Sequence, residues 1–159
     1  MVERLSRDNM LLGVAVIIGQ RGTCSRLSVG AVASIDGRII ATGYNGAPSG
    51  LPHCDHRCTC QGEVSVARPH HTLCPGRLTS CENAEHAERN AIAFAARHGL
   101  ALKGSEMHVT HAPCLQCARS IINAGIQRVT YINPYRLTDG VDLLVQAGIQ
   151  VVDWHKKKA

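Results

Sequence analysis

Two short motifs limit what this chain can be more than any other feature of its sequence. The first is His86-Ala87-Glu88, and the second is the run Pro113-Cys114-Leu115-Gln116-Cys117. Zinc in proteins is usually four-coordinate, and a catalytic zinc site keeps one position open for water. His86, Cys114 and Cys117 would supply three ligands. Glu88 is then left over as a carboxylate beside that water, where it can act as a general acid and base.

The combined pattern H-x-E followed by P-C-x-x-C is typical of zinc-dependent nucleobase deaminases. Two other interpretations compete with it. The zinc could be purely structural, with Glu88 only occupying a helix start, or His86 could be a core histidine near two buried cysteines. A non-catalytic zinc-binding interaction module would need a closed ligand shell, but the sequence offers no fourth ligand near Cys114 and Cys117. Aromatic residues that could stack on nucleic-acid bases are also scarce.

Length and composition favour a single domain over residues 1–159, with a Cys/His-rich insertion at about 51–82. Apolar residues make up 45% of the chain but aromatic residues only 3%, so the core must be built from Ala, Val, Ile and Leu. The formal net charge is +5, and Lys156, Lys157 and Lys158 contribute three of these charges. This excess suits a small anionic substrate, and it does not indicate a nucleic-acid partner.

The sequence also bears on the compartment. No stretch approaches the roughly 20 apolar residues that span a membrane. The apolar run Leu11–Gly19 is short and follows several charged residues, so we do not interpret it as a signal peptide. The eight cysteines are interspersed with histidines, which favours metal binding over disulfides. We therefore expect a cytoplasmic protein with no membrane partner.

Hydrophobic periodicity and turn signals predict an α/β fold. Helices are expected through most of the stretch from Glu3 to about Gln20, from about Asn83 to Gly99, from Pro113 to Gly125, and over Asp139–Ala147. Strands are expected at Val29–Ile35, Arg38–Tyr44, Glu106–Thr110, Gln127–Ile132 and Ile149–Val152, with Asp36-Gly37 as a hairpin turn. This order implies a mixed five-stranded sheet with helices on both faces, in three α/β/α layers.

The predicted helices would bring the candidate ligands together. Cys114 is expected in the first turn of its helix, where the helix dipole favours the thiolate, and Cys117 follows one turn later on the same face. His86 is expected at the start of the preceding helix, on which Ala87, Ala91, Phe94, Ala95 and His98 recur at helical spacing. Both helix starts can then meet at one edge of the sheet, where ligands usually bind in open α/β sheets.

Two loops carry further candidates. The glycine-rich loop Gly43–Gly50 contains Asn45, which could contact substrate, although turn chemistry alone would account for its composition. The insertion is dense in cysteine and histidine and shows no periodicity. A second metal could hold it together, and a loop with free thiols is the alternative. Spacing alone does not decide which residues would bind that metal.

At this point the sequence resembles the deoxycytidylate (dCMP) deaminase family of the cytidine deaminase-like superfamily. The resemblance covers most of residues 20–152. It is carried by Val29-Gly30-Ala31, Gly43-Tyr44-Asn45-Gly46 with Pro48 and Gly50, the stretches 86–92 and 96–99, the cysteine motif, and Ile121–Ile126. It implies the cytidine deaminase-like fold, with His86, Cys114 and Cys117 as ligands of a catalytic zinc and Glu88 as the proton shuttle.

The same resemblance implies substrate contacts. Asn45 matches the residue that contacts the deoxyribose, the backbone of Ala87 matches the group that reads the pyrimidine edge, and Tyr135 matches an aromatic residue against the nucleotide. Val29, in a matched motif, is a further candidate. The loop at Ser25 and Arg26 is a plausible phosphate clamp, but a solvated surface arginine would explain Arg26 nearly as well.

Some family members carry a second, structural zinc. By that resemblance its candidate ligands here are Cys24, Cys54, Cys81 and His71, with Cys58, Cys60, Cys74 and His70 as alternatives. The family is usually hexameric and often regulated by dCTP and dTTP, so a homo-oligomer and these effectors are expected partners.

The implied reaction is the zinc-dependent hydrolytic deamination of dCMP to dUMP, which supplies deoxynucleotide for dTMP synthesis. A zinc-bound hydroxide would attack C4 of the cytosine ring while Glu88 moves the protons. A 5-modified dCMP is an alternative substrate, because one methyl group in a pocket changes specificity only modestly. Free cytidine, guanine or a tRNA adenosine are further alternatives, although the tRNA substrate would need a broader basic surface.

Overall fold

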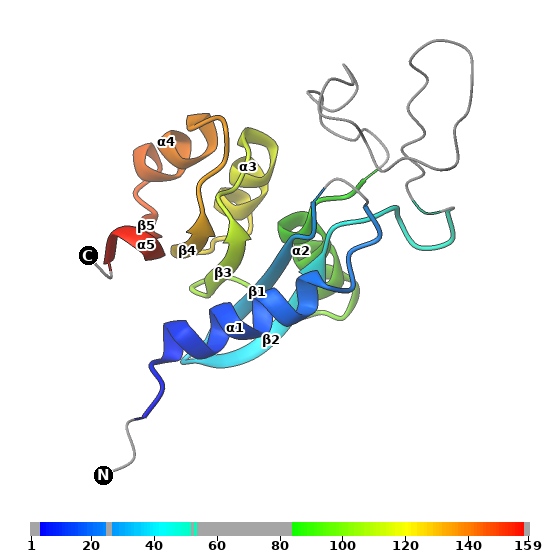
Figure 1. The fold of residues 1–159 in the computed structure, drawn as a ribbon, viewed down its shortest axis with the longest axis horizontal. Coiled ribbons are helices and arrows are strands. Elements are labelled where there is room, and N and C mark those ends of the chain that lie inside the picture. Colours follow the sequence, from blue (N-terminus) through cyan, green and yellow to red (C-terminus); the bar gives the residue numbers. More distant parts are fainter. Residues whose placement is uncertain (1–3, 25–26, 52, 54–83, 158–159) are drawn as a thin grey trace, which may run out of the picture.

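The computed structural model describes residues 4–24, 27–51, 53 and 84–157 (Figure 1). Its helices are α1 (Arg7–Gly19), α2 (Ala87–Arg97), α3 (Leu115–Asn123), α4 (Asp139–Gln146) and α5 (Trp154–Lys157). Its strands are β1 (Gly30–Ile35), β2 (Arg38–Tyr44), β3 (Glu106–His111), β4 (Arg128–Asn133) and β5 (Gln150–Asp153). Each expected strand and each expected long helix is present, which confirms the predicted order of elements.

The strands form one five-stranded sheet in the order β2-β1-β3-β4-β5. β1 pairs antiparallel with both β2 and β3, whereas β3, β4 and β5 run parallel. Asp36 and Gly37 join β1 to β2 with φ values of 52° and 77°, as a two-residue hairpin turn requires. The parallel strands are connected through α3 and α4. The prediction of a mixed five-stranded sheet is therefore confirmed.

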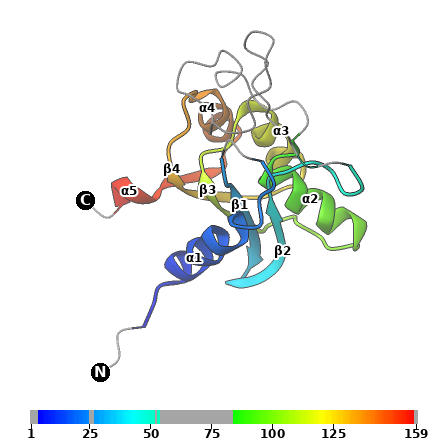
Figure 2. The same ribbon diagram turned by 45° about the vertical axis from the view of Figure 1, so that its right-hand side comes forward.

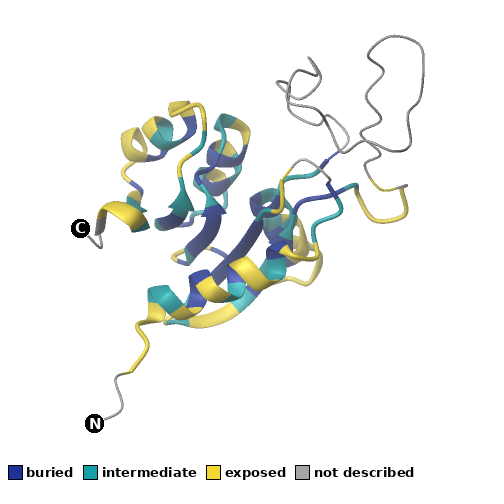
Figure 3. Ribbon diagram, in the orientation of Figure 1, coloured by how far each residue is buried: buried dark blue, intermediate teal, exposed yellow. Residues whose placement is uncertain are grey.

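Helices cover both faces of this sheet (Figures 1 and 2). On one face, Leu11 and Ala15 of α1 pack on Val32 of β1. On the other face, residues of α2, α3 and α4 form the main core with the alternate positions of the strands, including Ala31, Ala33, Met107, Val109 and Val129. Successive strand residues point to opposite faces, so both layers of helices find an apolar surface. The three-layer arrangement is confirmed, and Figure 3 shows the buried residues concentrated along the sheet.

Small residues let α2 lie very close to the sheet. A Cβ atom on Gly43 of β2 would stand 2.2 Å from the carbonyl oxygen of Ala87 and 2.5 Å from the nitrogen of Ala91. Ala87, Ala91 and Ala95 are all buried on the face of α2 that meets β2 and β1. The glycine in the strand and the alanines in the helix therefore fix where the start of α2 lies.

The structure adds three local details to the predicted elements. The first helix begins at Arg7, because Ser6 is its N-cap and accepts a hydrogen bond from the backbone nitrogen of Asn9. Phe94 and His98 do not face the core: they are exposed, and their rings lie 4.4 Å apart on the outer side of α2. The short helix α5 was not expected.

Across the described ranges, no helix combines the length and the apolar character needed to cross a membrane.

Candidate active site

The candidate ligands come from the starts of two neighbouring helices. His86 is the N-cap of α2, Cys114 is the N-cap of α3, and Cys117 lies in the first turn of α3. Pro113 was expected to start this helix and Cys114 to lie in its first turn. The helix instead begins at Leu115, directly after Cys114. The thiol of Cys114 still lies at the helix N-terminus, where free backbone N–H groups favour an anion.

These three side chains form a compact triangle. His86 Nδ1 lies 3.5 Å from Cys114 Sγ and 3.4 Å from Cys117 Sγ. Ligands at about 2.0 Å (nitrogen) and about 2.3 Å (sulfur) from a tetrahedral zinc are about 3.5 Å apart. The donor set and its spacing thus fit a zinc ion. In the described part of the chain, no fourth His, Cys, Asp or Glu joins this group, which leaves room for water or substrate.

The electrostatics of the triangle also suit a cation. Hydrogen bonds from Cys117 and His86 lower the pKa of the Cys114 thiol to about 3. The Cys117 pKa is raised by its hydrogen bond with Cys114 and by burial. The pKa of His86 is raised, chiefly by its hydrogen bond with Cys114. A divalent cation would replace these protons as the positive partner of the two thiolates.

Glu88 is a buried carboxyl beside this triangle. It lies in the first turn of α2 and is only 3% exposed. Burial raises its pKa, and a backbone hydrogen bond, the charge of His86 and a hydrogen bond with Cys117 partly offset this effect. A carboxyl group whose pKa is raised by burial holds a proton more readily than an exposed one, which suits a residue that accepts and returns protons.

Two residues that sequence reasoning gave no role hold the start of α2 in place. Glu85 Oε1 accepts a hydrogen bond from the backbone nitrogen of His86 at 3.0 Å and pairs with Arg89 at 2.6 Å. The backbone of Glu85 also exchanges two hydrogen bonds with Gly46 of the glycine-rich loop. Asn90 Nδ2 donates a 2.8 Å hydrogen bond to the carbonyl oxygen of Tyr44. Their position beside the H-x-E motif is the sequence feature that could have pointed to this role.

Asn45 is buried, and its side chain ties two loops together. Its Oδ1 accepts from the backbone nitrogen of Val29 at 2.8 Å, and its Nδ2 donates to the carbonyl oxygen of Leu27. Its backbone carbonyl accepts from Thr23. Asn45 therefore shapes the segment around Val29, beside the predicted phosphate clamp. Ser25 and Arg26 of that clamp lie outside the described residues.

Ala87 and Tyr135, the remaining substrate candidates, lie in two different segments of the chain. Ala87 is fully buried directly after His86, in the first turn of α2. Tyr135 follows β4 and is half-buried against the main core, with the Arg136 guanidinium 5.9 Å from its ring centre. Both belong to segments that begin or end at the same edge of the sheet as the zinc triangle.

Of the candidates for a second zinc, only Cys24 falls within the described residues. It is buried with Ala84 and next to Ala47 of the glycine-rich loop. Cys54, His71 and Cys81, like the alternatives Cys58, Cys60, Cys74 and His70, lie outside the described part of the chain. The second zinc therefore stays a prediction.

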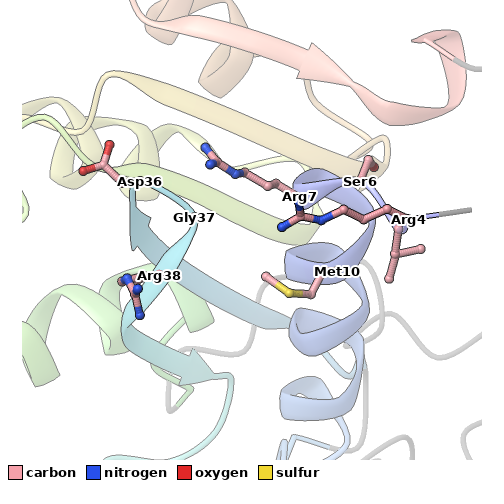
Figure 4. Close-up of a pocket in the computed structure, with 8 residues that line it drawn as sticks. Arg4, Ser6, Arg7, Met10, Asp36, Gly37 and Arg38 are labelled. Atoms are coloured by element: carbon pink, nitrogen blue, oxygen red, sulfur yellow. The ribbon is translucent and has the colours of Figure 1, made fainter. Parts of the chain in front are cut away.

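Two other polar features lie away from the triangle. Asp8, Glu106 and His108 gather under α1, but the guanidinium of Arg128 already pairs with both carboxylates at 2.9 Å. A hollow of about 570 Å³ lies between the start of α1 and the Asp36-Gly37 turn (Figure 4). Its lining includes Arg4, Arg7 and Arg38 but none of the candidate catalytic residues.

Comparison with known proteins decides the family. The family described as the cytidine and deoxycytidylate deaminase zinc-binding region matches residues 5–133. The chain belongs to this family. It is 35% identical to the deoxycytidylate deaminase of Enterobacteria phage T2, over 91% of this chain and 90% of that protein.

Two further relatives agree with this assignment. The deoxycytidylate deaminase of Mycobacterium phage D29 is 40% identical, over 78% of this chain and 92% of that protein. The crystal structure of the dCMP deaminase from cyanophage S-TIM5 in complex with dCMP and dUMP superposes with a TM-score of 0.76. It is 31% identical and covers 96% of this chain and 99% of that one. The expected family and fold are therefore confirmed.

Proposed function

We propose that this protein is a zinc-dependent deaminase that hydrolyses dCMP to dUMP and ammonia. One observation carries the proposal most directly: a zinc-sized triangle of His86, Cys114 and Cys117 with the buried carboxyl of Glu88 beside it. The relatives named as deoxycytidylate deaminases, and the related structure with dCMP and dUMP, support dCMP as the substrate.

In this mechanism the chain binds the metal and moves the protons. When bound, zinc lowers the pKa of a water molecule from about 15.7 to about 7. Glu88 accepts the proton of the water whose oxygen adds to C4 of the cytosine ring, and passes a proton to N3. It then delivers a proton to the departing amino group, because ammonia is a poor leaving group unless it is protonated. The C4–N bond breaks as the C4 carbonyl forms.

We assign the substrate contacts as follows. Asn45 and the segment at Val29 bind the deoxyribose side of the nucleotide, the backbone of Ala87 reads the pyrimidine edge, and Tyr135 lies against the nucleotide. Ser25 and Arg26 hold the phosphate. The buried bridge from Asn45 to Val29 and Leu27 supports this assignment, because it orders the loop just after the clamp.

The test is ammonia release, followed with the accompanying ultraviolet change, from dCMP and deoxycytidine at equal concentration. We expect a strong preference for dCMP, because the 5′-phosphate adds charge-assisted hydrogen bonds. Equal rates, or no reaction with either compound, would overturn the substrate. Including 5-methyl-dCMP and 5-hydroxymethyl-dCMP tests the alternative of a modified substrate, and cytidine, guanine and tRNA test the remaining alternatives.

The resemblance to the family also supports several finer proposals. The protein is a single domain with a second, structural zinc held by Cys24, Cys54, Cys81 and His71. It forms a homo-oligomer, a hexamer, that responds to dCTP and dTTP, and it works in the cytoplasm. Zinc content per chain, sedimentation analysis and dCMP kinetics with each triphosphate added would test the metal, the assembly and the regulation in turn.

A further inference from the structure

The hollow at the start of α1 is lined mainly by positive charge. It measures about 570 Å³ and lies between the first residues of α1, with those just before them, and the turn that joins β1 to β2. Among the described residues that line it are three arginines, Arg4, Arg7 and Arg38, and one carboxylate, that of Asp36. Figure 4 shows Arg4 and Arg7 reaching from the start of α1 toward the turn. Two separate elements therefore bring guanidinium groups to one concave surface.

No carboxylate in the described part of the chain pairs with these three arginines. The arginines that form ion pairs there are Arg89 and Arg128. Asp8, the neighbour of Arg7 on α1, pairs with Arg128 at 2.9 Å instead. Like charges that face one hollow repel one another, and an anion bound between them would remove this repulsion.

The side chain of Arg7 lies directly over the turn. A Cβ atom on Gly37 would stand 3.0 Å from Arg7 Cδ and 3.2 Å from Arg7 Nε, so the glycine leaves the space that the arginine occupies. Arg38 follows this turn as the first residue of β2. Contact with the turn limits the motion of the Arg7 side chain before any ligand arrives, which lowers the entropy cost of binding.

The hollow lies at the end of the sheet away from the zinc triangle. Ser34, near the end of β1, pairs with Glu106, the first residue of β3, because the two strands run antiparallel. The cysteine motif follows the opposite end of β3, after His111. A ligand in the hollow would therefore occupy a site separate from the nucleotide proposed to bind at the zinc.

We infer that this hollow binds the phosphate groups of a small anion that carries a chain of two or three phosphates. Guanidinium groups match phosphate oxygens with paired, charge-assisted hydrogen bonds, and three of them can hold more than one phosphate. The volume is within the range of about 300–1,000 Å³ that is usual for small-molecule sites. Inorganic polyphosphate and nucleoside diphosphates or triphosphates both offer this chemistry, and the apolar side chains of Leu5 and Met10 line the same hollow.

Isothermal titration calorimetry on the full, zinc-loaded chain tests the inference, with ADP and inorganic tripolyphosphate as separate probes. Saturating dUMP is present to fill the proposed nucleotide site. Arg7→Gln and Arg38→Gln should each weaken binding at least about 10-fold, because each removes charge-assisted hydrogen bonds. Chelation of zinc by tripolyphosphate would be the same in every variant, so it cannot imitate this loss.

Asp36→Asn is the variant with the opposite expectation. It removes the negative charge from the lining, so binding should become about 2-fold to about 5-fold tighter. Asparagine also tolerates the left-handed φ of 52° at this position, so the turn should be kept. Arg119→Gln is the matched control, because Arg119 is an exposed arginine on α3. It should leave binding unchanged.

Far-UV circular dichroism shows that each variant is folded. The inference is overturned if neither probe binds, if Arg7→Gln and Arg38→Gln bind like the unsubstituted chain, or if adenosine binds as tightly as ADP. Tighter binding of ADP than of tripolyphosphate would support a nucleotide as the ligand, and the reverse would support an inorganic polyphosphate. A chain that binds a probe in the hollow but does not deaminate dCMP would count against the proposed function alone.

Discussion

The side-chain amide of Asn90 donates a 2.8 Å hydrogen bond to the carbonyl oxygen of Tyr44. Asn90 lies one turn after His86 on α2, and its backbone nitrogen bonds to the carbonyl oxygen of His86. Tyr44 ends β2, immediately before Asn45 in the glycine-rich loop. This bond therefore joins the helix that carries His86 and Glu88 to the loop proposed to hold the nucleotide.

Asn90→Ala tests this link. We expect the free energy of unfolding to fall by about 1 kcal/mol, the usual net contribution of one hydrogen bond. The turnover of dCMP should fall as well, because the loop and the zinc ligands lose their common anchor. Urea denaturation and steady-state kinetics measure the two effects. Asn123→Ala, at an exposed position in the last turn of α3, is the control and should change neither.

Glu88→Gln separates metal binding from proton transfer. Glutamine keeps the shape of the side chain but cannot accept or return the proton. We expect zinc content to stay unchanged while kcat for dCMP falls by about 100-fold to about 10,000-fold, the range typical of a lost general acid–base group. Elemental analysis and the ammonia assay provide the readouts. Near-normal turnover in this variant would contradict the assigned role of Glu88.

Removal of zinc should lower stability as well as activity. A ligand that binds only the folded chain stabilises it by about 2.7 kcal/mol at a concentration 100 times its Kd. A strong chelator should therefore lower the Tm, and added zinc should restore it. Cys114→Ser should carry about one zinc per chain fewer than the unsubstituted protein, because one ligand of an already open shell is lost. An unchanged zinc content would show that Cys114 is not a ligand.

Stability should fall in mildly acidic solution because of His108. This side chain is fully buried, and burial lowers its pKa below the usual 6.5, although hydrogen bonding with Asp8 partly opposes the shift. Below about pH 6.5 the unfolded chain then binds more protons than the folded chain, so the free energy of unfolding decreases as the pH falls. His108→Gln should show a smaller decrease between about pH 7.5 and about pH 5.5 in urea denaturation. An identical pH dependence in both proteins would exclude His108 as the cause.

Two glycines should respond to alanine in opposite directions. Gly43→Ala would place a methyl group against the backbone of α2, and we expect it to cost about 1–3 kcal/mol of stability through overpacking. Gly13→Ala adds a methyl group into open space on a helix and should gain up to about 1 kcal/mol. Both are measured by urea denaturation. Similar effects at the two positions would contradict the close approach of β2 and α2.

The sequence by itself determined the order of elements and the zinc donors. Alternation and helical spacing depend on neighbouring residues, so the five strands, the Asp36-Gly37 turn and the main helices could be predicted locally. The two motifs named His86, Cys114, Cys117 and Glu88 because zinc chemistry demands those residue types at short spacing. Helical spacing grouped Phe94 with Ala87, Ala91 and Ala95, but it did not show that the alanines are buried while the Phe94 ring is exposed and lies against His98.

Only the tertiary structure decided the relationships between residues far apart in the chain. It brought His86 to within 3.5 Å of both thiols and buried Glu88 beside them. It also gave roles to Glu85 and Asn90. Such contacts depend on how β2, α2 and α3 pack against one another. The spacing of residues along the chain cannot encode distances that arise only when separate elements meet.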